Sequence, residues 1–130
     1  MTDGEPLAWS GGDRVVVPMP EEIDVSNSAQ VGERLNLALL RGVPMMIADF
    51  TQTRFSDVCG AQVLALVRGL AAELNVGLRA VVASAAVLRA FELAGLDELV
   101  PVYPSLAAAL AASPASDDLR LVHRDLPGPS

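Results

Sequence analysis

Asp49-Phe50-Thr51-Gln52-Thr53-Arg54-Phe55-Ser56-Asp57-Val58-Cys59-Gly60 is the stretch that decides how this chain of 130 residues folds. An apolar run over 43–48 precedes it and predicts a buried strand, and an apolar-periodic run over 61–74 follows it and predicts a helix. A strand that leads through a polar loop into a helix places unpaired backbone N–H groups and the positive end of a dipole at one surface point. We therefore expect the functional site in this stretch.

The composition narrows the class of protein. The length suits one domain, and the single cysteine and single histidine exclude an internal disulfide and a Cys- or His-rich metal site. The net charge of −7 argues against nucleic acid and anionic membranes as partners, because both require clustered lysine and arginine. The first six residues lack the features of a signal peptide, and no apolar run reaches the ~18 residues of a membrane span. We therefore expect a cytoplasmic protein with no membrane insertion.

Strand and helix patterns alternate along the chain. A hairpin is predicted from about residue 7, with strands over 7–9 and 14–17 joined through a glycine-containing turn. Further strands are predicted over 45–48, 78–82 and 99–103, the last at a sheet edge because of Pro101. Helices are predicted from the cap at Asn27 to Arg41, over 59–75, over 85–94 and over 106–112. This β-β-α-β-α-β-α-β-α order predicts an α/β fold with a largely parallel sheet.

The whole of 1–112 is predicted to be one domain. The polar, proline-rich segment 113–130 is expected to be a flexible tail in which His123 is a solvated side chain. Helix ends carry their own signals, since Asn27 with Gln30 forms a capping-box pattern and Gly42 suits a left-handed stop after a basic last turn. Apolar periodicity predicts that the helix over 85–94 buries Val87, Leu88, Phe91 and Leu93.

Four segments of the chain resemble a known family. They are Glu22-Ile23-Asp24-Val25, Ala48-Asp49-Phe50-Thr51, Phe55-Ser56-Asp57-Val58-Cys59-Gly60 and Phe91-Glu92-Leu93-Ala94-Gly95-Leu96-Asp97. In this order and spacing they resemble the STAS domain, which occurs in sulfate transporter tails and in bacterial anti-sigma factor antagonists. The composition and the Tyr103-Pro104-Ser105-Leu106 element are similar to those of actinobacterial members.

The resemblance implies a small mixed sheet with helices packed chiefly on one face, and a role in partner switching. Such antagonists bind an anti-sigma factor, a protein kinase of the histidine-kinase-like ATPase class, and thereby release the sigma factor. The kinase phosphorylates a serine in an Asp-Ser-Ser/Thr-Gly signature, and the phosphate breaks the complex. The resemblance implies a monomer or weak homodimer without a cofactor.

This sequence departs from the signature at the decisive positions. When Asp57 and Gly60 are aligned with its aspartate and glycine, Val58 takes the first hydroxyl position and Cys59 takes the position of the phosphoacceptor. Neither side chain accepts phosphate from a serine kinase. Ser56 carries the nearest hydroxyl and is a possible alternative acceptor, with Thr51 and Thr53 as weaker candidates. The loop is therefore expected to be a docking surface rather than a phosphorylation switch.

The residues around this loop allow more than one role. Asp57 is interpreted as a helix N-cap that can also contact a partner, and Asp49 either holds the loop or is a solvated strand end. Cys59 is either a redox-sensitive thiol or a small packed hydrophobe. Leu66, opposite the buried face of its helix, either stands alone or extends an apolar patch. The partner-binding surface is expected to comprise Asp24, Asn27, Thr53, Ser56, Asp57, Val58, Cys59, Gly60, Gln62 and Leu66.

Other functions remain open at this stage. A STAS scaffold or accessory subunit, in a stressosome or with a lipid-transport ATPase, is one alternative, and a small-ligand sensor is another. Catalysis is not expected, because the sequence has no phosphate-cradling glycine motif, no metal-ligand set and no Ser-His-Asp combination.

Overall fold

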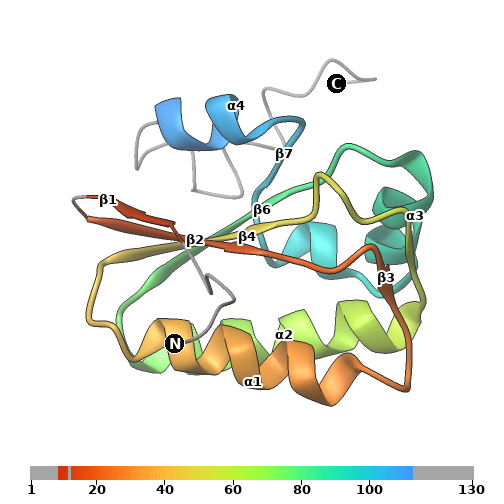
Figure 1. Ribbon diagram of the computed structural model, residues 1–130, viewed down its shortest axis with the longest axis horizontal. Helices are drawn as coiled ribbons and strands as arrows, with labels where there is room; N and C mark the ends of the chain where they lie inside the picture. Colours follow the sequence, from red (N-terminus) through yellow and green to blue (C-terminus); the bar gives the residue numbers. More distant parts are fainter. Residues whose placement is uncertain (1–8, 12, 113–130) are drawn as a thin grey trace.

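A five-stranded sheet forms the centre of the fold (Figure 1). The computed structural model describes residues 9–11 and 13–112, so the predicted tail over 113–130 lies outside the described residues. The strands lie in the order β1 (Trp9–Gly11), β2 (Arg14–Pro18), β4 (Met45–Asp49), β6 (Gly77–Val81) and β7 (Val102–Tyr103). All neighbours run parallel except β1 and β2, which form the predicted hairpin. The largely parallel α/β sheet is confirmed.

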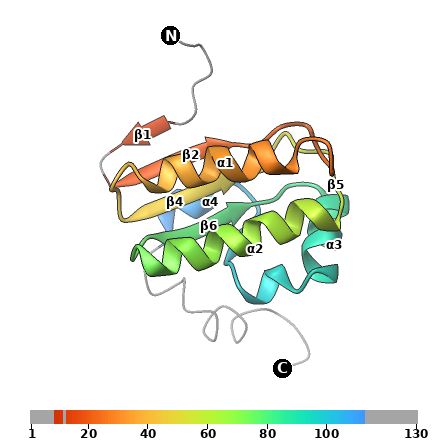
Figure 2. The same cartoon turned by 90° about the horizontal axis from the view of Figure 1, so that it is seen from below.

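Most of the helices cover one face of this sheet. α1 (Ser28–Leu39) and α2 (Val58–Glu73) lie side by side across it (Figure 2), and α3 (Ala85–Leu93) packs against α2. α4 (Leu106–Ala111) lies on the opposite face and packs against β6 and β7 (Figure 1). The prediction that helices gather chiefly on one face is therefore confirmed.

The strand before the decisive stretch, β4, is central, as its composition predicts. Its middle residues Met46, Ile47 and Ala48 are all fully buried. Because helices cover both faces of the sheet at this strand, apolar side chains are required on both sides of the pleat, and the run shows no alternation.

Two apolar clusters hold the layers together. The larger one lies between the sheet and α1, α2 and α3, and in it the rings of Phe50 and Phe91 meet edge to face with their centroids 5.2 Å apart. The smaller one joins Ile47 and Val81 of the sheet to Ala109 of α4. Phe50, the residue that follows β4, is thus anchored in the larger cluster.

A buried cation, Arg79, lies beside the smaller cluster. Its side chain is only 2% exposed, and its guanidinium donates to the carbonyl oxygens of Ala109 at 2.5 Å and Ala112 at 3.2 Å. It also lies 5.7 Å from the centroid of the Tyr103 ring. Arg79 therefore satisfies carbonyls at the C-terminal end of α4, which have no partner inside the helix.

Several predicted boundaries are corrected. In the hairpin, β1 continues through Gly11, so only positions 12 and 13 separate the paired strands. α1 ends at Leu39, so Arg41 is not in its last turn, although Gly42 has the predicted left-handed backbone with φ of 80°. α2 ends at Glu73 rather than at residue 75, Asn75 takes a left-handed backbone with φ of 58°, and β6 begins at Gly77.

The third helix and the last strand also differ from expectation. α3 buries Val87, Ala90 and Phe91, whereas Leu88 and Leu93 are exposed, because a helix that packs on one narrow side buries only residues three and four apart. A 3-10 helix, η1 (Leu96–Glu98), occupies part of the chain before the last strand. β7 is shorter than the predicted strand because only Val102 and Tyr103 pair with β6, and it lies at the predicted sheet edge.

Candidate functional site

A second, two-stranded sheet organises the candidate site. β3 (Glu22–Ile23) and β5 (Phe55–Ser56) pair in parallel, with Glu22 opposite Phe55 and Ile23 opposite Ser56. The carbonyl of Ile23 also accepts a hydrogen bond from the N–H of Asp57 at 3.1 Å. Because α1 follows β3 and α2 follows β5, this pairing brings the first turns of both helices to one end of the molecule (Figure 2).

The loop between β4 and β5 is fastened to the segment between β2 and β3. The hydroxyl of Thr53 donates to the carbonyl of Pro20 at 2.6 Å, and the amide of Gln52 donates to the carbonyl of Met19 at 2.9 Å. Thr53 is only 1% exposed. The structure thus places Thr53, which we included in the partner-binding surface, in a buried anchor beneath that surface.

Two aspartates close turns in this region. Asp49 accepts a hydrogen bond from the N–H of Thr51 at 3.0 Å, so it holds the loop, as one of its two interpretations proposed. Asp24 accepts from the hydroxyl of Ser26 at 2.5 Å and from its N–H at 2.9 Å. The hydroxyl bond first, and then the N–H bond, lower the pKa of the Asp24 carboxyl below its ordinary value.

Asn27 does not form the predicted capping box. Its side chain makes no hydrogen bond to the first turn of α1. Its carbonyl oxygen accepts instead from the N–H of Asp24 at 3.0 Å, and its amide donates to the carbonyl of Glu22 at 2.8 Å. Asn27 therefore ties β3 to the start of α1, because both ends of its amide are oriented toward this turn and not toward the helix N–H groups.

Asp57 is the N-cap of α2. Its backbone is extended, and its carboxylate accepts from the N–H of Gly60 at 3.2 Å. The cap interpretation is therefore confirmed, and Val58 and Cys59 are the first two helical residues, with the Cys59 side chain half-buried.

The packing behind this cap is tight at Gly60. A Cβ atom added to Gly60 would overlap the hydroxyl oxygen of Ser56 and would lie 2.7 Å from Cγ2 of Ile23. Ser56 is 5% exposed, and its hydroxyl donates to the carbonyl of Asp57 at 3.1 Å. Gly60 is thus required by the close approach of α2 to the β3–β5 pair. Phosphorylation of Ser56 would require this packing to open.

Three large apolar side chains are exposed at the same end of the molecule. They are Val25 at 76%, Phe55 at 49% and Val58 at 39%, and we call them the apolar patch. Only Val58 was among the predicted surface residues. In most strands the aromatic side chain is buried and the serine is exposed, but here Phe55 is exposed and Ser56 is buried. A strand of two residues is too short for sequence periodicity to show which side chain faces the core.

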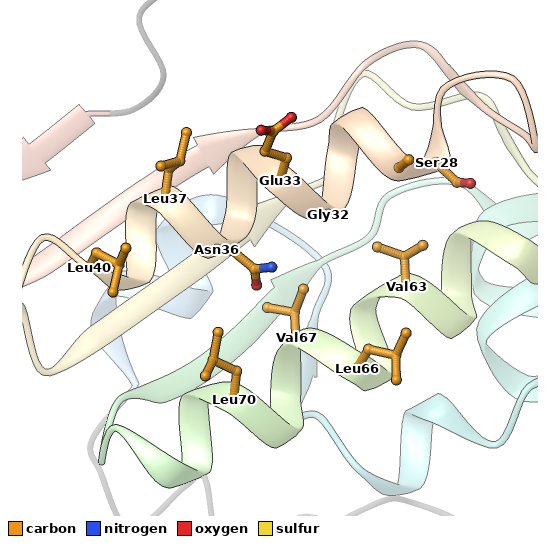
Figure 3. A pocket seen from close by; sticks show the side chains of 11 residues that line it. Ser28, Gly32, Glu33, Asn36, Leu37, Leu40, Val63, Leu66, Val67 and Leu70 are labelled. Carbon is orange, nitrogen blue, oxygen red and sulfur yellow. The ribbon is translucent and has the colours of Figure 1, made fainter.

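A groove between α1 and α2 begins beside these first turns (Figure 3). Its volume is about 480 Å³; Val63 and Val67 point from α2 toward α1, and Asn36 points from α1 toward α2. Leu66 is 78% exposed and lies on the wall of this groove, and Gln62 is exposed one turn earlier on α2. Leu66 is therefore not isolated, because Leu37, Leu40 and Leu70 line the same groove.

The described residues lack two kinds of feature, a metal-ligand group and a membrane-spanning helix. Among residues 9–11 and 13–112, no three His, Cys, Asp or Glu side chains are grouped so that they could hold a metal ion. Over the same residues, none of the helices has the length and apolar character needed to cross a bilayer. What the described residues present is a capped helix start, exposed apolar side chains and carboxylates.

Comparison with known proteins gives one family and a set of similar folds. The sequence model of the STAS domain matches residues 9–109. The fold is similar to that of an anti-sigma factor antagonist from Mycobacterium paratuberculosis, with a TM-score of 0.70 and 24% identity over 80% of this chain and 88% of that chain. No curated protein matches this sequence closely enough to count as a relative.

Two further solved structures have a similar fold. The Bacillus anti-sigma factor antagonist SpoIIAA in its unphosphorylated form is similar with a TM-score of 0.59 and 22% identity over 75% of this chain and 85% of that chain. The murine anion transporter Slc26a9 is similar with a TM-score of 0.62 and 17% identity. That match covers 78% of this chain but only 18% of the transporter chain. At these identities the similarity concerns the fold alone.

Proposed function

This chain belongs to the STAS domain family, and on that premise we propose that it is a protein-binding module that docks on an anti-sigma factor of the histidine-kinase-like ATPase class in the cytoplasm. The docking surface is the end of the molecule where α1 and α2 begin. The proposal assigns the protein no catalytic step, and it binds its partner without a cofactor.

One observation carries the proposal most directly. Val25, Phe55 and Val58 are exposed around a helix start whose backbone is held by Asp57 and by the β3–β5 pair. Exposed apolar side chains on a fixed backbone lose little conformational entropy on binding, so they are suited to a protein interface. Two of the similar structures are anti-sigma factor antagonists, which supports the choice of partner.

The docking surface has no phosphoserine switch of the usual kind. The signature positions carry Val58 and Cys59, and the nearby Ser56 hydroxyl is buried against Gly60. In a protein with a serine at position 59, a phosphate would add about −1.5 to −2 charge units at this helix start, which a desolvated interface would not accept. On this proposal, partner binding is not controlled by a phosphoserine at position 58 or 59.

A scaffold or accessory-subunit role is the second candidate. It is favoured by the similarity of the fold to one part of the Slc26a9 transporter chain, in which a domain of this size accounts for a fraction of a larger protein. In that case the partner would be a permease or a transport ATPase rather than an anti-sigma factor.

Affinity capture of the full chain from its native cell, followed by mass spectrometry, tests the proposal. We expect a kinase-like ATPase among the captured proteins. Val58→Asp should abolish its capture without harming the fold, because position 58 is exposed and a carboxylate in the first helical turn is stabilising by about 0.3–1 kcal/mol.

The matched control is Leu74→Asp, which changes a similarly exposed leucine at the C-cap of α2, the opposite end of the helix that Val58 begins. Capture of a permease or transport ATPase instead would favour the second candidate. A kinase-like ATPase captured equally by wild type and Val58→Asp would contradict the proposed surface.

A further inference from the structure

The apolar patch is surrounded by carboxylates. Glu22 lies opposite Phe55 in the β3–β5 pair, Asp24 follows directly in the turn, and Asp57 caps the neighbouring helix. Both Glu21 and Glu22 are exposed. The patch therefore combines an exposed phenyl ring with a strongly negative surrounding.

Arg54, directly before β5, and Arg34, on α1, have partners of their own. α3, which packs against β5, adds one exposed arginine, Arg89, and one exposed glutamate, Glu92. Arg54 lies beside Phe55 in the sequence, but its guanidinium pairs with Glu21 at 3.6 Å, and both side chains are about 70% exposed. Arg34, further along α1, donates to the carbonyl of Pro18. The hydrogen bonds from Ser26 favour the ionised form of Asp24, so its charge persists at neutral pH.

We infer that the apolar patch and its carboxylates, if they act as proposed above, bind a basic surface of the partner protein. On that partner, an apolar pocket receives Phe55, and lysine or arginine side chains at the border of the pocket face Glu22 and Asp24. Large aromatic side chains that become fully desolvated dominate the affinity of protein interfaces. Charges at the rim of an interface act mainly on the association rate and on specificity, and their effect is screened by salt. Nucleic acid and anionic membranes carry the same sign of charge as this surface and are repelled by it.

The exposed leucines of the groove between α1 and α2 have few charged neighbours, in contrast to the apolar patch. The groove between α1 and α2 is lined by eleven residues, of which Glu33 alone is charged. The carboxylates around the apolar patch therefore favour a partner of positive charge, whereas the lining of the groove favours no particular charge on a partner.

A random-peptide phage library tests the inference without knowledge of the native partner. Selection on the immobilised full chain should enrich peptides that contain arginine or lysine together with leucine, valine or an aromatic residue. Phe55→Ala should weaken binding of a selected peptide at least about tenfold. Glu22→Lys should slow its association, and the difference from wild type should shrink as ionic strength rises.

The controls are matched in chemistry and lie elsewhere. Leu74→Ala removes another exposed apolar side chain and Glu73→Lys reverses another exposed carboxylate, both at the far end of α2; neither should change peptide binding. Selection of acidic peptides, of peptides that bind Phe55→Ala and Glu22→Lys as well as wild type, or of no peptide at all would overturn the inference. The proposed function is tested separately, by the identity of the protein captured from the native cell. If that protein belonged to another class, the proposed function would fail, but the result of the peptide selection would still stand.

Discussion

Replacing Gly60 by alanine should destabilise the protein, although alanine normally favours a helix over glycine. The added Cβ would overlap the Ser56 hydroxyl oxygen and lie 2.7 Å from Cγ2 of Ile23. Ser56 can turn its hydroxyl away, but Ile23 is 1% exposed and β-branched, so its methyl group cannot move without shifting β3. The contact with Ile23 therefore decides the outcome.

The magnitude follows from two opposing terms. An extra methyl group in a well-packed site costs about 1–3 kcal/mol, and the gain in helix propensity from glycine to alanine offsets about 0.5–1 kcal/mol of this. We expect a net loss of about 1–2 kcal/mol in the free energy of unfolding, which corresponds to roughly 5–10 °C in Tm for a domain of this size.

Gly69 provides the control within the same helix. A Cβ added there meets no atom within 4 Å, so Gly69→Ala should stabilise the protein by about 0.5–1 kcal/mol through helix propensity alone. Urea unfolding followed by circular dichroism measures both variants. If Gly60→Ala were as stable as wild type or more stable, the tight packing of α2 on the β3–β5 pair would be refuted.

The remaining predictions concern one cap, one buried cation and one titration. Asp57→Ala should cost about 1 kcal/mol in urea unfolding because the Gly60 N–H loses its side-chain acceptor and keeps only the Asp57 carbonyl, whereas Asp57→Asn should cost much less; equal losses would argue against the cap. Arg79→Met should destabilise by about 2 kcal/mol or more because carbonyls at the end of α4 lose a charged donor, and Arg79→Lys should recover only part of this, since an ammonium lacks the planar fork. Folding lowers the pKa of Asp24, so the contribution of this carboxylate to stability is present above its ordinary pKa and is lost as the pH falls through its pKa in the folded protein. Ser26→Ala should raise the pKa of Asp24 in the folded protein, measured by a carbon-13 NMR titration. An unchanged pKa would show that the hydrogen bond from the Ser26 hydroxyl does not cause the shift.

The parts of the fold that could be predicted are those whose signal is local. β4 is a continuous apolar run, and α1 repeats its buried residues every three or four positions, as Val31, Leu35 and Leu39 do. Such a pattern depends only on which face of a helix or strand is buried, so it can be recognised without knowing which element packs against that face. The strand end, loop and helix start at which we expect the site were recognisable for the same reason, because they are consecutive in the sequence; their role in binding stays a prediction.

The parts that could not be predicted depend on partners far apart in the chain. β3 and β5 are two residues long and exist because Glu21 and Ile23 accept hydrogen bonds from residues 54, 55 and 57. Asn27 has a capping sequence, yet its amide is used by Asp24 and Glu22. Exposure of Phe55 follows from that pairing and has no separate sequence signal.

Arg79 illustrates the same limit on the other face of the sheet. An arginine between Leu78 and Ala80 suggests a solvent-facing position, but α4 covers it and supplies the carbonyl acceptors that make its burial possible. The acceptors lie about thirty residues later in the chain, so no local pattern could reveal them.

Hydrogen exchange of the full chain, alone and in complex with the partner captured from its native cell, tests the docking surface most directly. We predict slower amide exchange on binding at residues 22–28 and 55–62, where the β3–β5 pair leads into α1 and α2, with no change in α4 and β7. Protection confined to α4 and the sheet face beneath it, with residues 22–28 and 55–62 unaffected, would contradict the assignment of this end of the molecule as the partner-binding surface.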